Sequence, residues 1–375
     1  MKYFNERHLR RLSAKKSRLT RSFNNNSGII LLVVLWTMVV LTTLAISLGR
    51  QTHVELTLAK HAIGKLKSKY LAWAGVISAI DQIRQDGEDA ASAEKDTLYY
   101  CGIPIKESPS PQDLFEKVEL EDGTYSVQYV PEGEGISKGT VYYGLQDEER
   151  RLNLNGLTNE NKDILIALLA LLGHDEDTAK TIALAIIDWK DEDSMSTDSI
   201  ESTEDDYYTG LSNSYHCKNH PLDTTEELLL IKGVTPQIYK DMAPFVTVFP
   251  KTGEFQVNFD TASETVLKAL THSVAGPATG TEVADADSLV EKMLTYRAGG
   301  DGLEFTPDDQ SIDINQFNVN AKERVLFLVI NQFRANSSQY LAADVVGIDK
   351  QRGARTHVQA IIQREDLSIV SWRRQ

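Results

Sequence analysis

The chain has 375 residues, of which 41% are apolar and 25% charged, and this length and composition predict a globular protein of two or three structural units. Its net charge of −15 is unevenly spread: residues 1–28 carry eight basic side chains and one acidic one, so the rest of the chain carries a net charge of −22. An acidic body argues against phosphate-rich partners such as nucleic acid and favours divalent cations or basic surfaces.

The N-terminal region predicts a membrane helix. Residues 29–48 are uncharged and predominantly apolar, which is the length needed to cross a bilayer. The basic residues precede this run, so the positive-inside rule leaves residues 1–28 in the cytoplasm and the body outside. A cleaved secretory signal fits less well, because the apolar run is long and lacks a small-residue cleavage site. Apolar residues continue at helical spacing, and no proline occurs before Pro104, so we expect one helix over residues 29–85.

Two groups of strands are expected in the body. Residues 124–130 and 140–147 have the pattern of a β-hairpin. Near the C-terminus, residues 338–349, 353–364 and 367–372 alternate and are rich in β-branched side chains. We therefore predict an α+β fold in which the long N-terminal helix packs on an antiparallel sheet.

Between the strand groups the pattern changes to short helices. They are expected at residues 164–172, at a segment capped by Asp177, from Thr224 or Thr225 to Ile231, at Pro236, and from a capping box at Thr261 and Glu264 to about Leu270. The sequence thus predicts an all-α domain at residues 156–245, inserted into a sheet domain made of residues 86–155 and 246–375.

The two cysteines leave two interpretations open. Cys101 and Cys217 have no neighbouring Cys or His at zinc-binding spacing. They either form one disulfide in an oxidising compartment or are two unrelated thiols.

The segment from Asp188 to Asp206 contains nine acidic residues and one lysine, and such a cluster repels itself unless a cation neutralises it. Calcium takes hard oxygen ligands from flexible loops, which suits carboxylates at Asp188, Asp191, Asp193, Glu204 and Asp205. The EF-hand spacing is absent. The alternative is a solvated acidic loop.

Two further classes of function have less support. Residues 228–239 resemble a helix-hairpin-helix, which can offer backbone N–H groups to a DNA phosphate. Acidic residues surround this segment, namely Asp223, Glu226, Glu227 and Asp241, so we expect a packing unit and no nucleic acid partner. The histidines are scattered and no nucleophile or zinc-protease signature occurs, so we expect no catalytic residue.

The segment SGIILLVVLW resembles the leader junction of type IV prepilins, in which a glycine ends a basic leader and the apolar helix follows at once. The resemblance implies that a prepilin peptidase cuts between Gly28 and Ile29, removes residues 1–28 and leaves Ile29 as a methylated N-terminus. Most pilin-like proteins carry a glutamate at the fifth mature position, which here is Val33. The K-type minor pseudopilin of type II secretion systems lacks this glutamate.

The body resembles the K-type minor pseudopilins in the order of its segments. They are RLNLNGL at residues 151–157, AIIDWKDED at 185–193, EDDYY at 204–208, CKNHPLDTTEELLLIKGV at 217–234 and VNFDTAS at 257–263. The resemblance implies a pilin-like α/β roll with an inserted α-domain whose acidic loop binds calcium.

The same resemblance implies a location and a role. The chain is expected to be a single-pass protein of the bacterial inner membrane with its body in the periplasm. It would cap the tip of the pseudopilus with the I- and J-type minor pseudopilins, start its assembly and support protein export. The major pseudopilin, the prepilin peptidase and the inner-membrane secretion platform are its other expected partners. A type IV pilus minor pilin or another single-pass envelope protein is the alternative, and a helix-hairpin-helix DNA receptor is the least favoured.

Overall fold

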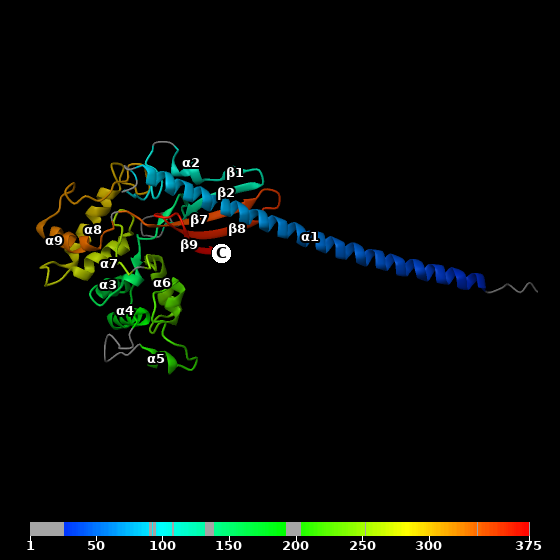
Figure 1. Ribbon diagram of the computed structural model, residues 1–375, viewed down its shortest axis with the longest axis horizontal. Coiled ribbons are helices and arrows are strands. Elements are labelled where there is room, and N and C mark those ends of the chain that lie inside the picture. The colour runs from blue at the N-terminus through cyan, green and yellow to red at the C-terminus, as the bar shows by residue number, and fades with distance from the viewer. Residues whose placement is uncertain are drawn as a thin grey trace, which may run out of the picture. The chain divides into compact units, whose positions relative to one another are not determined.

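The computed structural model (Figure 1) describes residues 26–89, 92, 95–106, 109–131, 139–192, 204–251, 253–335 and 337–374. The chain divides after Lys60 into two compact parts, residues 1–60 and residues 61–375. In the first part the described residues form one helix, and the second part contains the sheet and the other helices.

The elements follow one another in the order that Figure 1 labels. The α-helices are α1 (Asn26–Glu88), α2 (Pro111–Phe115), α3 (Lys162–Leu171), α4 (Glu176–Lys190), α5 (Asp205–Thr209), α6 (Pro236–Met242), α7 (Glu264–Val274), α8 (Val283–Arg297) and α9 (Ala321–Ile330). Short 3-10 helices are η1 (Leu154–Gly156), η2 (Thr225–Leu230), η3 (Ala243–Phe245) and η4 (Asn331–Phe333). The strands are β1 (Val118–Leu120), β2 (Gly123–Tyr129), β3 (Tyr142–Tyr143), β4 (Gln146–Asp147), β5 (Leu152–Asn153), β6 (Val246–Thr247), β7 (Tyr340–Asp349), β8 (Arg355–Gln363) and β9 (Ile369–Arg374).

Helix α1 confirms the predicted single long helix and extends it by three residues at each end. Every described side chain in residues 28–60 is exposed. In the second part of the chain, α1 buries one face, and its spacing of three and four residues is that of an amphipathic helix. This face consists of Gly64, Ser68, Leu71, Ala72, Gly75, Val76, Ala79 and Ile83.

The sheet has the strand order β1-β2-β7-β8-β9 and is antiparallel throughout, with β3 added beside β2 and β4 beside β7. The predicted C-terminal strands are confirmed as β7, β8 and β9. The expected hairpin is confirmed where β2 pairs with β3. The second strand of that hairpin was predicted to run without a break over residues 140–147, and this is wrong. Gly144, with φ of +135°, separates β3 from β4.

One face of the sheet packs directly on α1. Strand β7 crosses the helix at Gly347, where an added Cβ would lie 2.3 Å from the carbonyl oxygen of Ser68 and 2.4 Å from the nitrogen of Ala72. Only glycine allows two backbones to come this close. The hydroxyls of Ser68 and Thr356 are 2.7 Å apart in the same buried layer. The core between helix and sheet includes Val76, Ile83, Val127, Val345 and Val358.

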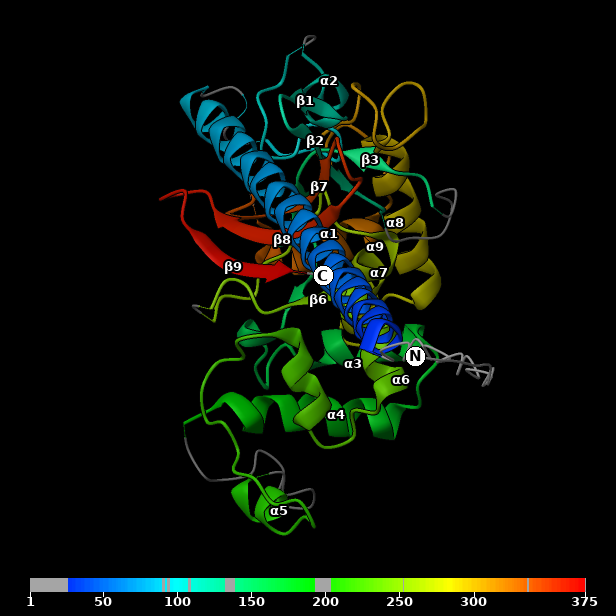
Figure 2. The ribbon, with the colours of Figure 1, turned by 90° about the vertical axis from the view of Figure 1, so that its right-hand side faces the viewer.

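A second hydrophobic core lies among the helices. It joins side chains of α3 and α4 to side chains of α7, α8 and α9, and it reaches the sheet at Ala342 and Ile361. In Figure 2, α3 and α7 lie side by side, and the two helices are in contact. The helical core therefore extends beyond the predicted α-domain of residues 156–245, because the three later helices α7, α8 and α9 share it. Their sequence signal includes the Asn320–Glu323 capping box that opens α9.

Two helices have their N-caps at other residues than we predicted. Asp175, and not Asp177, caps α4 by accepting a hydrogen bond from the N–H of Thr178. Ser263, and not Thr261, caps α7. The segment after Thr224 forms the 3-10 helix η2 in place of the predicted α-helix. The predicted helix start at Pro236 is confirmed.

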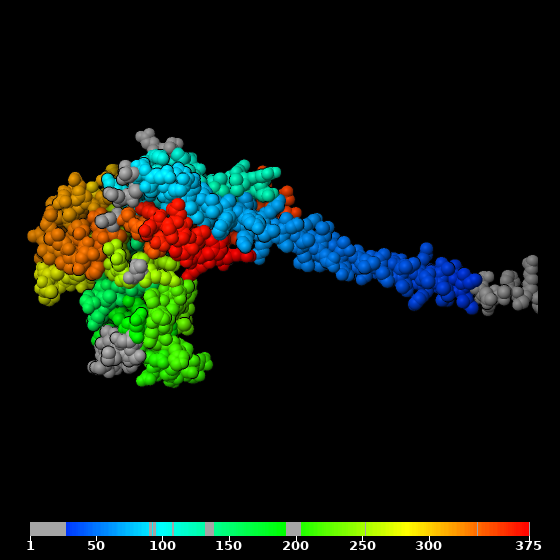
Figure 3. Space-filling model, viewed as in Figure 1, coloured from blue at the N-terminus to red at the C-terminus, as the bar shows by residue number. Residues whose placement is uncertain are grey.

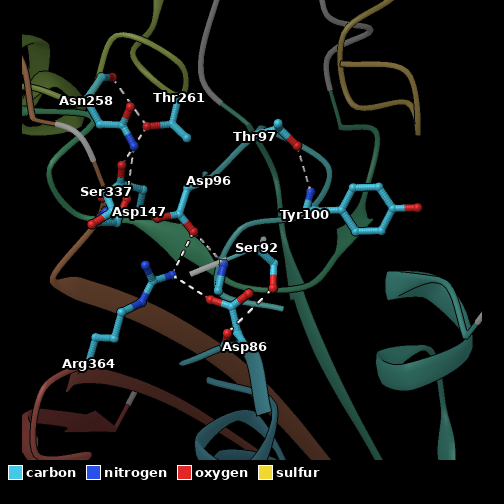
Figure 4. Close-up of polar contacts among 12 residues, drawn as sticks. Asp86, Ser92, Asp96, Thr97, Tyr100, Asp147, Asn258, Thr261, Ser337 and Arg364 are labelled. Atoms are coloured by element: carbon cyan, nitrogen blue, oxygen red, sulfur yellow. Dashed lines mark hydrogen bonds and ion pairs between the residues drawn. The ribbon is translucent and has the colours of Figure 1, made fainter. Parts of the chain in front are cut away.

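Buried carboxylates and one guanidinium join the end of α1 to the sheet (Figure 4). The Asp96 carboxylate accepts hydrogen bonds from the N–H groups of Gly102 at 2.9 Å and Ser338 at 2.8 Å, and from Arg364 Nη2 at 2.7 Å. Arg364 Nη2 also lies 3.1 Å from Asp86 Oδ2. Burial, which outweighs the attraction of Arg364, raises the pKa of Asp86 to about 6.

Asp147 and Glu149 continue this junction toward the helices. Thr261 Oγ1 donates to Asp147 Oδ2 at 2.6 Å, and the N–H of Gln339 donates to Glu149 Oε2 at 2.7 Å. Burial raises the pKa of both carboxyls, and the nearby Asp147 raises that of Glu149 further, to about 8. The junction therefore buries more carboxyl groups than its guanidinium can neutralise.

Candidate metal centre

The predicted acidic segment brings three carboxylates together at the end of α4. Asp188 is in the last turn of α4, Asp191 is the C-cap of that helix, and Glu204 is the N-cap of α5. One carboxylate oxygen of each residue lies within 4.8 Å of the others. The last turn of α4 and the start of α5 therefore lie beside the same three carboxylates.

These carboxylates have the composition and spacing of a calcium site. Asp188 is fully buried and Glu204 is 5% exposed. Oxygens that share one Ca²⁺ at 2.3–2.6 Å are at most about 5 Å apart, and the observed separation falls within that limit. The three ligands are hard oxygen donors, whereas a zinc site is usually built with thiolate or imidazole ligands. The residues present therefore fit calcium.

Asp205, which was also predicted as a ligand, has other partners and does not belong to this cluster. The N–H of Cys217 donates to Asp205 Oδ1 at 2.8 Å, and Nδ1 of His216 lies 2.9 Å from Asp205 Oδ2. His216 first, and then the N–H of Cys217, lower the pKa of Asp205 below its usual value. Asp205 thus holds residues 216–217 beside α5. Asp193 lies outside the described residues.

An aromatic group supports the cluster, and the sequence analysis did not identify it. Trp189 follows Asp188 on α4, and its ring is 5.0 Å from that of Tyr208 and 6.2 Å from that of Tyr215, centroid to centroid. Tyr208 is fully buried on α5. Because these residues are distant in sequence and are not metal ligands, only their contacts reveal their common role in holding α4 and α5 together.

Of the two interpretations left open for the cysteines, the structure favours two separate thiols, because Cys101 and Cys217 are both free and buried. Cys101 belongs to the core between α1 and the sheet, whereas Cys217 belongs to the core among the helices. Cys217 Sγ lies 3.6 Å from the carbonyl oxygens of Asp188 and Trp189. The two thiols are separate packing groups.

The hairpin around Gly233 is packed against the helical core. A Cβ added at Gly233, whose φ is +85°, would lie 3.0 Å from the side chain of Ile182 on α4. The acidic flanks bind cations of the chain itself: Asp223 pairs with Lys218 and Lys251 at 2.8 and 2.5 Å. This arrangement supports the packing role that we predicted for the hairpin.

The predicted processing site lies near the start of α1. Gly28 and Ile29 are both exposed on the helix. The part of α1 from Gly28 onward is long and apolar enough to cross a membrane. Val33 follows within the same exposed apolar run.

Comparisons with known proteins agree with this arrangement. Residues 150–251 match the family described as "Type II secretion system (T2SS), protein K". A protein assigned as a type II secretion system protein K in Escherichia coli strain K12 is 26% identical over 251 residues, which are 64% of this chain and 68% of that protein. The type II secretion system protein K of Aeromonas hydrophila is 26% identical over 255 residues, with the same coverage.

A solved structure shows the same fold. The chain resembles one in the crystal structure of the GspK-GspI-GspJ complex from enterotoxigenic Escherichia coli, with a TM-score of 0.56 and 16% identity. The likeness covers 87% of this chain and 99% of that one. With its long N-terminal helix, its antiparallel sheet, the helical region that follows Arg150 and the matching relatives, the chain belongs to the protein K family of the type II secretion system, whose members are minor pseudopilins.

Proposed function

We propose that this minor pseudopilin is inserted in the inner membrane through α1, with its body in the periplasm, and that it caps the tip of the pseudopilus and starts its assembly. The observation that carries the proposal is the continuous helix α1, which begins in an apolar run and ends packed on the sheet. Val33 supports a tip position, because an apolar residue there cannot neutralise the N-terminal ammonium of a subunit ahead. The role is structural and not enzymatic.

The proposed partners are the I- and J-type minor pseudopilins, with the major pseudopilin below them. The resemblance to a chain of the GspK-GspI-GspJ complex supports the first two. The peptidase is expected to cut between Gly28 and Ile29 and to methylate Ile29, and the inner-membrane platform would then receive the mature subunit.

N-terminal mass analysis tests this proposal. The full chain is expressed with and without the prepilin peptidase of its own secretion system. A peptidase-dependent start at Ile29, and loss of exoprotein secretion when the gene is deleted, are the expected results. Replacing Gly28 with alanine should leave the leader attached, whereas Gly49→Ala, later in the same helix, should leave processing unchanged. An uncut chain, or secretion that continues without the gene, would overturn the proposal.

The calcium site is part of the proposed function. Asp188, Asp191 and Glu204 would hold the ion with carboxylate oxygens that lie within 4.8 Å of one another, and such hard oxygen ligands are those that calcium prefers. Binding would tie the end of α4 to the start of α5, and so stabilise the helical region by the binding free energy.

Calorimetry and thermal unfolding of the full chain in detergent test the calcium site. We expect heat on calcium addition, a melting temperature that falls with chelator, and a change in fluorescence from Trp189. Asp188→Asn or Glu204→Gln should remove these responses. Asp205→Asn is the matched control, because it removes a neighbouring carboxylate that is not part of the cluster. A chain without calcium-dependent heat or melting would refute the site.

A further inference from the structure

An uncharged pocket opens where the residues after α1, helix α2, the strands β2 and β3, and the loop after α8 meet. Its volume is about 240 Å³, and its aromatic lining residues are Tyr99, Tyr129, Tyr142, Tyr143 and Phe305. None of the described lining residues is charged, although the chain as a whole carries a net charge of −15. In Figure 2 the golden loop after α8 lies beside α2 and β3, and Figure 3 shows the orange residues that follow α8 next to the cyan ones that follow α1.

The aromatic rings of this pocket form a continuous wall. The Tyr142 ring is stacked on that of Tyr129, with their centroids 6.2 Å apart, and the Phe305 ring lies 4.6 Å from the Tyr142 ring. Tyr129 is buried, whereas Tyr99, Tyr142 and Phe305 are only half-buried. Because an aromatic ring packs best through its face or edge against another flat surface, the half-buried rings offer a platform to a flat, partly apolar ligand.

The position of Phe305 is maintained against backbone strain. Its φ is +64°, in the left-handed region that bulky side chains rarely adopt. Its N–H donates to Asp309 Oδ2 at 3.0 Å, which holds this conformation in place. Strained residues of this kind concentrate at functional sites. The strain here holds the Phe305 ring against Tyr142 and so completes the aromatic wall.

The pocket also offers uncharged hydrogen-bonding groups. Nε2 of Gln112 donates to one carboxylate oxygen of Glu116 at 2.5 Å, and the Tyr143 hydroxyl donates to the other at 3.2 Å. These bonds fix the Gln112 amide at the rim and leave its Oε1 atom able to accept. The hydroxyls of Tyr99 and Tyr142 form no hydrogen bond within the described part of the chain, so each can donate to a ligand or accept from it.

A sugar ring fits this combination of groups. A pyranose has an apolar face of C–H groups, which stacks on an aromatic ring, and hydroxyls at its edge, which bond to amides and phenols. An anion would lack a cationic partner among the described lining residues, and a purely apolar ligand would leave the polar groups of the pocket unpaired. The volume is below the roughly 300 Å³ at which pockets for drug-sized ligands begin, so the pocket accommodates one ring of a longer chain.

We propose that this pocket binds one uncharged, N-acetylated sugar ring of the cell-wall glycan. The inference rests on the proposed function, because the proposed periplasmic position of the body is what brings it to that glycan. Every second ring of the glycan is N-acetylglucosamine, which carries no charge. This ring stacks on Tyr142, and its hydroxyls bond to Gln112 and Tyr99. Its acetyl methyl group has apolar neighbours in Leu98 and Val141, which also line the pocket.

Saturation-transfer NMR of the full chain, in a detergent without a sugar head group, tests the class of ligand. The probe is the linear tetramer of N-acetylglucosamine. We expect transfer to its ring and acetyl protons, and weaker transfer to cellotetraose, which lacks the acetamido group. Decaproline, an extended peptide of the kind that also docks in aromatic grooves, should not displace the tetramer. Absence of transfer to the tetramer, or its displacement by decaproline, would overturn the inference.

Co-sedimentation of the full chain with purified cell-wall sacculi tests the residues. Tyr142→Ala should weaken binding at least tenfold and Gln112→Ala several-fold. Tyr70→Ala, which removes an exposed tyrosine of α1 outside the pocket, should change binding less than twofold. Melting curves verify that each variant folds, and Gln112 is exposed, so its replacement leaves the core intact. Unchanged binding by both pocket variants would contradict the inference. A chain that is cut at Ile29 but binds no sugar loses only this inference, whereas an uncut chain loses the proposed function.

Discussion

The guanidinium of Arg373 in β9 donates to both carboxylate oxygens of Glu226 in η2, each at 2.6 Å. The pair joins the last strand of the sheet to η2, and its two residues are 147 positions apart. The acidic residue that argued against DNA binding in the sequence therefore has a partner within the chain.

A double-mutant cycle of Glu226→Ala and Arg373→Ala should give a coupling energy of about 1 kcal/mol, because two-point contact is stronger than an ordinary surface pair. Urea unfolding at low salt measures it, and the coupling should shrink in high salt. Lys117 and Glu119, which are more exposed and 4.0 Å apart, are the control pair and should show coupling near zero. Equal coupling in the two pairs would contradict the structural role of Arg373.

Stability should fall as the pH rises through the range in which Asp86 and Glu149 lose their protons. Their pKa values in the folded state, about 6 and about 8, lie above those of an unfolded chain. The contribution of these two groups to the free energy of unfolding is therefore fully present below about pH 4 and is lost as the pH rises to about 8. The charged groups that act on Asp86 and Glu149 include Asp96, Asp147 and Arg364.

Glu149→Gln should flatten this pH dependence, since the amide cannot ionise. The loss between pH 5 and pH 8 should decrease by on the order of 2 kcal/mol, measured by urea unfolding in matched buffers. Glu119→Gln, on an exposed position of β1, should leave the pH dependence unchanged. A wild-type chain that gains stability up to pH 8 would show that the junction is ionised and compensated in another way.

Gly347→Ala should destabilise the chain by about 2 kcal/mol or more, because the new methyl group would meet the backbone of α1. Gly276→Ala is the control, since a Cβ there has no atom within 4 Å, and its effect should stay within about 0.5 kcal/mol. Thermal unfolding in detergent compares them. Equal melting temperatures would mean that β7 and α1 are further apart than described.

Reducing agent should leave the melting temperature unchanged, because Cys101 and Cys217 belong to different cores. Burial raises the pKa of the Cys217 thiol to about 11 and also raises that of Cys101 well above its ordinary value, so both should react slowly with alkylating reagents until the chain unfolds. Mass spectrometry of the unreduced, denatured chain should find two alkylated thiols. A mass two hydrogens lower, without alkylation, would show the disulfide.

Periodicity predicted the elements that repeat a pattern over many residues. Helix α1 and strands β7 to β9 follow from spacing alone, because their buried faces recur at three to four or at two residues. Predicted caps were displaced by two residues, since neighbouring Asp, Ser and Thr compete for the same N–H groups. Helices α8 and α9, which share the core of α3 and α4, were not predicted.

The candidate site was predictable only in part. The acidic run identified Asp188, Asp191 and Glu204, whose convergence depends on where α4 ends. The sequence could not predict that Asp205 contacts His216 and Cys217, because these contacts depend on how residues 216–217 fold back on α5. The buried junction of Asp96 and Arg364 left no local signal, since its members are 268 positions apart.

The pairing of β2 with β7, in which Val127 lies opposite Val345, decides when the sheet can form. When the chain enters the compartment in which it folds with its N-terminal part first, β2 emerges long before β7. The apolar face of α1 therefore stays exposed until β7 has emerged. Closing the long loop between β2 and β7 is slow. Helices α3 to α9 have a core of their own, so we expect them to fold first and thereby to shorten the loop. We expect a chain that stops before residue 340 to retain these helices and to leave α1 open to chaperones and proteases.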